Sequence, residues 1–183
     1  MEKGHMDRKE LIFKRIRETE DDEYLFTEKL LVDAFPPDEY RSLAQQREFV
    51  KRRENFHMNI ICCPTGPVGI ISYWIFDTFT YVEHFAIVPT LRSNGYGAAA
   101  IVKLIEQEKS IVLEVEKPDD ETSRRRIAFY RRCGLELCEK EYIQPAYRAD
   151  SNEIPMYLMS RGVNVEHNFE HIKSTIYREV YGK

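Results

Sequence analysis

The stretch AIVPTLRSNGYG at residues 86–97 decides the fold class. An apolar segment ends at Val88, a short turn follows, and the closely spaced Gly95 and Gly97 open a segment whose apolar residues have helical spacing. A strand, a turn and a helix start in this order present unpaired backbone N–H groups and the positive end of the helix dipole to an anion. Because glycine has no Cβ, a phosphate-bearing ligand can approach the backbone closely here. The spacing fits neither G-x-G-x-x-G nor G-x-x-x-x-G-K-[ST], which excludes dinucleotide-binding and P-loop sites.

The segments before this stretch predict an antiparallel meander. Three apolar, β-branched runs are separated by turn residues at 64–67 and 77–78. In chain order, the expected elements are a strand at 11–17, a helix at 18–33 with Thr19 as its N-cap, a helix from Asp38 to Arg53, and strands at 57–63, 68–76 and 79–88.

The segments after it alternate between helix and strand patterns. The expected elements are a helix at 95–108, a strand at 111–115, a helix at 119–132 ended by Gly134, strands at 135–143 and 153–160, and an amphipathic helix within 163–183. A meander that leads into β-α-β indicates an α/β (α+β) fold, with a mostly antiparallel mixed sheet of about six to seven strands, helices on both faces and an extra C-terminal helix.

The pattern predicts one domain with two terminal additions. The domain is expected at residues 11–162, after an N-terminal tail at 1–10. Residues 163–183 are expected to form a helical extension packed on the domain. Such a helix could cover an edge strand or mediate a homodimer.

The composition limits the partners and the compartment. The 183 residues include 27 basic and 31 acidic side chains, a net charge of −4, which argues against a mainly electrostatic hold on nucleic acid or an anionic membrane. The four cysteines have neither disulfide-framework nor zinc-site spacing, so no metal is expected. No apolar run approaches the roughly 18 residues of a membrane span, and the charged N-terminus lacks a secretory signal. These features predict a cytoplasmic protein with free thiols.

Two motifs resemble the signatures of one enzyme family. R-S-N-G-Y-G at residues 92–97 resembles the pyrophosphate-binding signature R-x-x-G-x-G of the GNAT superfamily of N-acetyltransferases. Further along, residues 128–135 resemble the family's second signature in its F-Y-x-x-x-G core. Both motifs stand in the family's order with a strand between them, and the element order over residues 11–160 matches the family. The family often has Asn at the position of Ser123, which can still donate one hydrogen bond.

This resemblance implies acetyl transfer from acetyl-CoA, as cosubstrate, to a primary amine by direct attack in a ternary complex. In the family, CoA lies where the fourth and fifth strands separate, here residues 79–88 and 111–115, and backbone groups at that point bond the pantetheine arm. Carried onto this sequence, the cofactor-binding residues are Ile87, Val88, Arg92, Ser93, Asn94, Gly95, Tyr96, Gly97 and Ser123.

The reaction needs an acid for the departing thiolate, a donor for the oxyanion and a base for the amine. The resemblance implies Tyr130 as the acid and the Val88 N–H as the oxyanion donor. The family often places its base on the fourth strand, where Glu83 and His84 stand among apolar residues. Glu83 is favoured, with His84 and then Glu114 on the next strand as alternatives. Simple alternation lets only one of Glu83 and His84 face the cleft.

Alternation also groups the residues around the favoured base. It places Glu83 on the same face as Tyr81, Phe85 and Ile87.

The acceptor and the oligomeric state stay open. The family varies its substrate region around the first two helices, so these helices and loop 35–41 are expected to form the acceptor-side wall. Tyr40 and Trp74 are candidates to line it, with packing in the core as the alternative. A polyamine, an antibiotic, an amino acid and a protein amine all agree with the resemblance, as does another acyl-CoA as donor. The rival class is a catalytically inactive CoA-binding regulatory or sensor protein on the same fold, because the phosphate site is better specified than the base.

Overall fold

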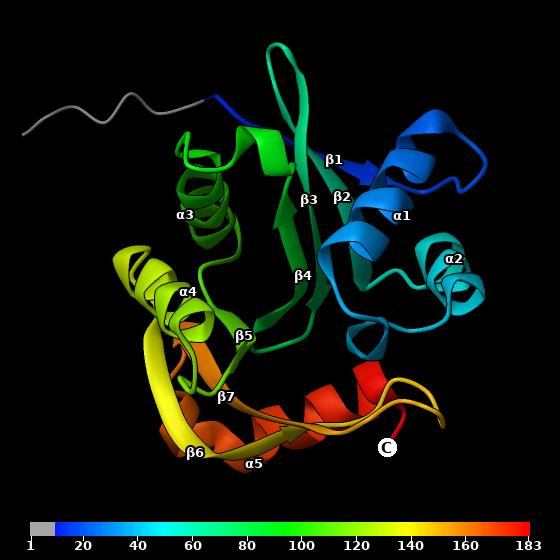
Figure 1. Cartoon of the computed structure of the whole chain (residues 1–183). Coiled ribbons are helices and arrows are strands. Elements are labelled where there is room, and N and C mark those ends of the chain that lie inside the picture. Colours follow the sequence, from blue (N-terminus) through cyan, green and yellow to red (C-terminus); the bar gives the residue numbers. More distant parts are fainter. Residues whose placement is uncertain (1–9) are drawn as a thin grey trace, which may run out of the picture.

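A seven-stranded sheet forms the centre of the molecule (Figure 1). The computed structural model describes residues 10–183, so the tail predicted at residues 1–10 lies outside the described residues except for Glu10. The strand order is β1-β2-β3-β4-β5-β7-β6, and every neighbouring pair is antiparallel except β4 and β5. The strands are β1 (Ile12–Ile16), β2 (Phe56–Cys63), β3 (Gly66–Ile75), β4 (Thr80–Ile87), β5 (Ile111–Glu116), β6 (Glu136–Gln144) and β7 (Ile154–Arg161).

Helices cover both faces of this sheet (Figure 1). The helices are α1 (Asp22–Ala34), α2 (Leu43–Arg52), α3 (Tyr96–Glu108), α4 (Glu121–Arg132) and α5 (Val165–Ile176), the last followed by a π-helical turn, Tyr177–Tyr181. α1 and α2 lie on one face and α3 and α4 on the other, while α5 packs against β6 and β7. The predicted fold class is confirmed. Within residues 10–183, no helix is long and apolar enough to cross a membrane.

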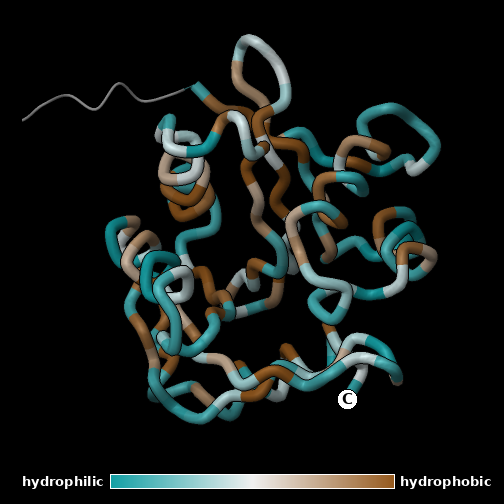
Figure 2. Tube along the Cα trace, in the orientation of Figure 1, coloured by the Kyte–Doolittle hydropathy of each residue, from teal (hydrophilic) through white to brown (hydrophobic). Residues whose placement is uncertain are grey.

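Each face of the sheet has its own hydrophobic core. Leu31 of α1, Trp74 of β3 and Ile172 of α5 belong to one core, and Leu104 of α3 and Ile127 of α4 to the other. Figure 2 shows hydrophobic residues along the central strands and hydrophilic residues in many of the outer turns and loops. Burial of these apolar surfaces is the main force that holds the helices on the sheet.

Two predicted helix starts on the α1 side are wrong. α1 begins after Asp21, whose side chain caps it, instead of after Thr19. α2 begins after Ser42 instead of Asp38, because residues 37–39 form a short 3-10 turn. Tyr40, which follows this turn, has extended backbone (φ −147°, ψ 155°), so the turn does not continue into the second helix. The turn so formed lies beside the functional site.

The sheet opens between its two parallel strands. β4 and β5 pair only at Thr80–Val82 and Ile111–Leu113. Beyond these residues β4 stays paired with β3 as far as Ile87. The opening lies at the carboxyl ends of two parallel strands, which is where α/β proteins commonly bind ligands.

Candidate functional site

A β-bulge in β4 sets the directions of two candidate bases. The pairing of β4 with β3 skips Glu83. Because an inserted residue shifts the alternation by one, Glu83 and His84 both point toward the face of α1, with 4.0 Å between His84 Nδ1 and Glu83 Oε2. Phe85 and Ile87 pack on the opposite face with α3 and α4. The prediction that Glu83 shares a face with Phe85 and Ile87, and that His84 points the other way, is therefore wrong.

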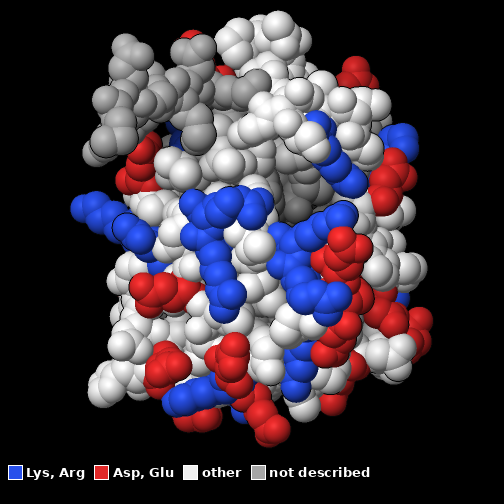
Figure 3. Space-filling model, turned by 60° about the vertical axis from the view of Figure 1, so that its left-hand side comes forward, with Lys and Arg blue, Asp and Glu red and all other residues white. Residues whose placement is uncertain are grey.

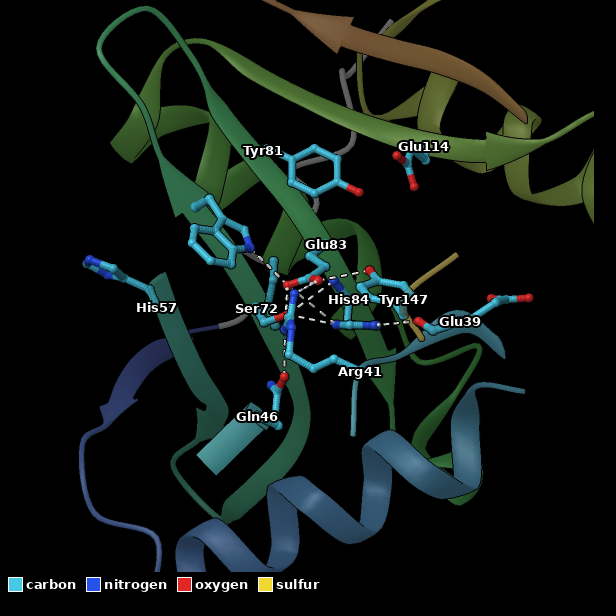
Figure 4. Close-up of polar contacts among 12 residues, drawn as sticks. Glu39, Arg41, Gln46, His57, Ser72, Tyr81, Glu83, His84, Glu114 and Tyr147 are labelled. Carbon is cyan, nitrogen blue, oxygen red and sulfur yellow. Dashed lines mark hydrogen bonds and ion pairs between the residues drawn. The ribbon is translucent and has the colours of Figure 1, made fainter. Parts of the chain in front are cut away.

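Glu83 is held in a buried ion pair. Its carboxylate accepts hydrogen bonds from Arg41, from Trp74 Nε1 at 2.9 Å and from the Tyr147 hydroxyl at 2.8 Å (Figure 4). The Arg41 and Glu83 side chains are 1% and 0% exposed. Burial alone would raise the pKa of Glu83, but the Arg41 guanidinium, with His84, brings that pKa below its usual range. A carboxylate with all these partners and a low pKa does not suit the predicted role of base.

His84 is buried with both ring nitrogens engaged. The Ser72 hydroxyl accepts the His84 backbone N–H at 3.2 Å and donates to Nδ1 at 3.1 Å. Nε2 donates to the Glu39 carbonyl oxygen at 2.9 Å. Burial lowers the pKa of His84, although the neighbouring Glu83 opposes this effect. The neutral ring therefore links β3 and β4 to the turn at 37–39, and has no lone pair left for a substrate.

Glu114 on β5 has different surroundings. Its carboxylate accepts hydrogen bonds from Tyr142 and from Tyr181, the latter at 2.9 and 3.2 Å. Burial raises the pKa of Glu114 to about 7, against the effect of the hydrogen bonds that it accepts. Figure 4 shows its carboxylate set apart from the Arg41–Glu83 pair, and it lines a cavity at the opening between β4 and β5. A carboxylate that changes its protonation near neutral pH suits proton transfer.

Tyr130 lines the cavity from α4. Its ring lies 5.1 Å from that of Phe129, and the side chain is 8% exposed. Burial raises the pKa of Tyr130 to about 12, so the hydroxyl keeps its proton at neutral pH. Among residues 10–183 the hydroxyl has no hydrogen-bond partner. It is therefore available to donate to a ligand in the cavity.

The N-terminus of α3 forms an anion-binding geometry at the same cavity. Its N-cap, Gly95, has left-handed backbone (φ 81°), and no side chain caps the first N–H groups of the helix. Ser93, Gly95 and Gly97 line the cavity, Ser93 with a φ of 64°. Arg92 lines it too, and its Nε donates to the Ile87 carbonyl at 3.2 Å. Free N–H groups, a helix dipole and a guanidinium fit a polyphosphate.

The Val88 N–H does not fit the predicted role of oxyanion donor. It donates to the Val68 carbonyl at 2.9 Å, on the β3 side of β4. Because successive N–H groups of a strand point to opposite sides, those of Phe85 and Ile87 point toward the opening instead. Ile87 thus keeps a donor for a ligand, although its carbonyl is engaged by Arg92.

Three other predicted cofactor contacts lie outside the cavity lining. Ser123 is 2% exposed because it forms a capping box with Asp120, which starts α4. The Asn94 side chain donates to two carbonyls of its own turn, each at 3.3 Å. Tyr96 is the third. Thr122, next to Ser123, does line the cavity.

A cavity of about 1210 Å³ runs through the opening and is divided by charge. Its basic lining residues are Arg92, before α3, and Arg125, Arg126 and Arg132 of α4, and its acidic ones are Glu39 of the turn at 37–39, Glu83 of β4, and Glu114 and Glu116 of β5. Two of these carboxylates are paired with an arginine, Glu83 with Arg41 and Glu116 with Arg126. Figure 3 shows basic side chains gathered across the middle of the face that it brings forward. Burial, with Glu116 as the second cause, raises the pKa of Glu39. The described residues contain no metal-ligating cluster of three or more side chains.

Comparison with known proteins identifies the family. The sequence profile described as "Acetyltransferase (GNAT) family" matches residues 14–135. The chain belongs to this family. A solved structure described as "Putative acetyltransferase from GNAT family from Bacteroides thetaiotaomicron" is similar to this GNAT protein with a TM-score of 0.90 and 46% identity, covering 94% of this chain and 99% of the other.

Two further proteins, both described as acetyltransferases, are less similar. "Putative acetyltransferase YjbC" of Bacillus subtilis (strain 168) is 31% identical over 104 residues, which cover 56% of this chain and 52% of YjbC, about half of that relative's length. A Bacillus subtilis acetyltransferase solved in complex with CoA has a TM-score of 0.58 at 16% identity, covering 85% of this chain and all (100%) of the other. At that identity the likeness shows the fold alone.

Four side chains that complete the site of this GNAT protein were not predicted from sequence: Arg41, Tyr142, Tyr147 and Tyr181. Arg41 stands in the loop expected to form the acceptor wall, but nothing around it in sequence distinguishes a buried arginine from an exposed one. The three tyrosines lie beyond residue 135, where the family match ends. The available signal was the concentration of tyrosine in the last part of the chain.

Proposed function

We propose that this GNAT protein transfers an acetyl group from acetyl-CoA to a primary amine that carries a positive charge. The observation that carries the proposal is the charge division of one cavity. Arginines and the uncapped α3 N-terminus line one part of it, the carboxylates of Glu39 and Glu114 line another, and Tyr130 also faces it from α4. A polyanionic donor and a cationic acceptor can therefore meet between β4 and β5. The cytoplasmic location expected from the sequence is kept as part of this proposal.

The donor side is built from backbone and arginine. The first N–H groups of α3 and the guanidinium of Arg92 would hold the pyrophosphate. The N–H groups of Phe85 and Ile87 are the donors available to the pantetheine arm and to a developing oxyanion. Arg125 and Arg132, on α4, offer further positive charge to the remaining phosphate.

Proton transfer in the proposed reaction uses two side chains. Glu114 takes a proton from the acceptor ammonium, which leaves the nitrogen with a free electron pair. That pair attacks the thioester carbonyl carbon, the C–S bond breaks with its electrons on sulfur, and Tyr130 gives its phenolic proton to that sulfur. The proton shed by the new amide nitrogen replaces the one lost by Tyr130 through solvent. The products are the acetylated amine, the CoA thiol and one proton, which Glu114 releases.

Substitution of Gly95 by tryptophan is expected to weaken acetyl-CoA binding about 100-fold or more, because a bulky side chain would cover N–H donors worth about 1.5–3 kcal/mol each to a charged ligand. Isothermal titration calorimetry with acetyl-CoA, CoA and ATP measures this effect. Gly66→Trp is the matched control, since Gly66 also has positive φ (131°) but is the first residue of β3, paired with Cys63. If wild-type protein binds no CoA, the proposed function is wrong.

Substitution of Tyr130 by phenylalanine is expected to lower kcat about 100-fold and to leave acetyl-CoA binding unchanged, since only the proton donor is lost. CoA thiol release is measured with spermidine, lysine, an aminoglycoside and a peptide with a free N-terminus as acceptors. Tyr157→Phe on β7 is the control. Binding of acetyl-CoA without turnover of any charged amine would favour the inactive regulatory protein instead.

A further inference from the structure

The end of the chain reaches the proposed base. Tyr181, the last residue of the π-helical turn, places its hydroxyl 2.9 Å from Glu114 Oε2 and 3.2 Å from Oε1. The same hydroxyl lies 3.3 Å from that of Tyr81, and the Tyr181 ring lies 4.7 Å from the ring of Tyr147. A residue from beyond the family match thus contacts both oxygens of a carboxylate on the central sheet.

The local structure fixes Tyr181 in this place. Val180 and Tyr181 are 4% and 9% exposed, and α5 before them is anchored in the core. Gly182 has left-handed backbone (φ 68°), and both it and Lys183 donate their N–H groups to the Tyr177 carbonyl. Such a terminal cap satisfies the last carbonyl groups of the helix. π-helical turns are rare in proteins as a whole, but those that occur are often found at functional sites.

The two buried carboxylates of the site are stabilised differently. Glu83 is neutralised by Arg41. Within residues 10–183, the side chains that donate hydrogen bonds to the Glu114 carboxylate are tyrosines, and no cation is among them. The ionisable groups that interact electrostatically with it are Tyr81 and Glu83 from β4, Tyr142 from β6, Tyr147 from the following loop, and Tyr177 and Tyr181 from the C-terminal turn. Its orientation and ionisation therefore depend on tyrosine hydroxyls.

We propose that Tyr181 is a positioning residue, which holds the Glu114 carboxylate for proton removal from the acceptor amine and so makes the C-terminal turn part of the active site. The catalytic part of this inference rests on the proposed function. A hydroxyl that donates to a carboxylate favours its ionised form. Loss of the Tyr181 hydroxyl should therefore make Glu114 ionise only at higher pH.

The test compares Tyr181→Phe with Tyr177→Phe in the full-length protein. Tyr177 lies in the same turn, but its hydroxyl donates to the Ile143 carbonyl at 2.5 Å and not to Glu114. The titration of the Glu114 side-chain carboxyl is followed by carbon-13 NMR in protein labelled on glutamate, with Glu114→Gln to assign the signal. We expect Tyr181→Phe to move the titration up by about one pH unit and Tyr177→Phe to leave it in place.

The same variants are compared by their pH dependence of kcat/KM. A shift of one pH unit predicts a rate loss of about five-fold at pH 7 that disappears at higher pH, whereas general damage to the fold lowers the rate at every pH. Tyr142→Phe, which removes the other hydroxyl, should shift the titration in the same direction.

Each result decides between the two proposals. The NMR titration needs neither acetyl-CoA nor an acceptor, so an unshifted Glu114 signal in folded Tyr181→Phe and Tyr142→Phe overturns the positioning role even if the protein is an active acetyltransferase. A shifted titration without a matching shift of the pH–rate profile overturns its catalytic part. A protein that titrates as expected but acetylates no amine refutes the proposed function alone.

Discussion

Replacement of Glu114 by glutamine is expected to lower kcat about 100- to 10,000-fold, the range that a positioned general base contributes. The amide fills nearly the same space and can still face Tyr142 and Tyr181, but it cannot take a proton. Acetyl-CoA affinity should be unchanged, because the basic half of the cavity is untouched. Turnover is measured as thiol release, and binding is measured by calorimetry.

The pH profile of the wild type provides an independent check. The base must be ionised to act, so kcat/KM should rise with pH through a limb near 7, where burial places the pKa of Glu114, and then level off. Glu141→Gln, at an exposed position on β6, is the matched control. If Glu114→Gln keeps the wild-type rate and the same limb, another group is the base.

Replacement of Arg41 by methionine is expected to cost about 3–5 kcal/mol of the free energy of unfolding, since it leaves Glu83 buried without its counter-ion. The Arg41 guanidinium also lies within reach of four aromatic rings, the nearest being Phe49 at 4.8 Å from its centroid. The double variant Arg41→Met/Glu83→Gln should recover part of the loss. Urea unfolding measures all three proteins.

The direction of the pH effect follows from the pKa of Glu83. In the wild type Arg41 lowers that pKa, so the pair stabilises the fold above the unfolded pKa, and the effect is lost as pH falls through the folded value. In Arg41→Met the main opposition to burial is gone and only His84 and the hydrogen bonds from Trp74 and Tyr147 remain, so the pKa of Glu83 should rise and stability should fall as pH rises through it. The difference in the free energy of unfolding between the wild type and Arg41→Met should therefore increase from pH 4 to pH 7.

An exposed pair gives the control for this loss. Arg17→Met breaks the Arg17–Glu54 contact, whose side chains are 59% and 86% exposed, and should cost less than about 1 kcal/mol. Arg41→Met as stable as Arg17→Met would show that the buried pair does not support the fold.

The order of helices and strands could be predicted because it depends on local patterns. Apolar runs, turn residues and glycines near 86–97 mark the meander and the α3 start without reference to distant residues. The direction of Glu83 could not be predicted, because a bulge is a property of the pairing of two strands. In a strand considered alone, side chains alternate regularly between the two faces of the sheet. Regular alternation therefore predicted Glu83 on the face of Phe85 and Ile87, which is the wrong face.

The candidate site could be predicted only where sequence motifs define its residues. Arg92, Gly95, Gly97 and Tyr130 were found through their motifs, and all four line one cavity. Their roles stay predictions. The choice of the general base among the two carboxyl groups and the imidazole depends on partners far along the chain. Arg41 for Glu83 and Tyr181 for Glu114 are examples that no local sequence pattern reveals.

The charge division of the cavity also affects product release. An ammonium held near a carboxylate gains about 4 kcal/mol at 4 Å and an effective dielectric constant of 20, and that attraction vanishes once the nitrogen becomes a neutral amide. Acetylation would therefore lower the affinity of the site for the product relative to the unreacted amine. Unreacted amine would displace the product from the carboxylates that line the cavity, which would limit product inhibition by the acetylated compound.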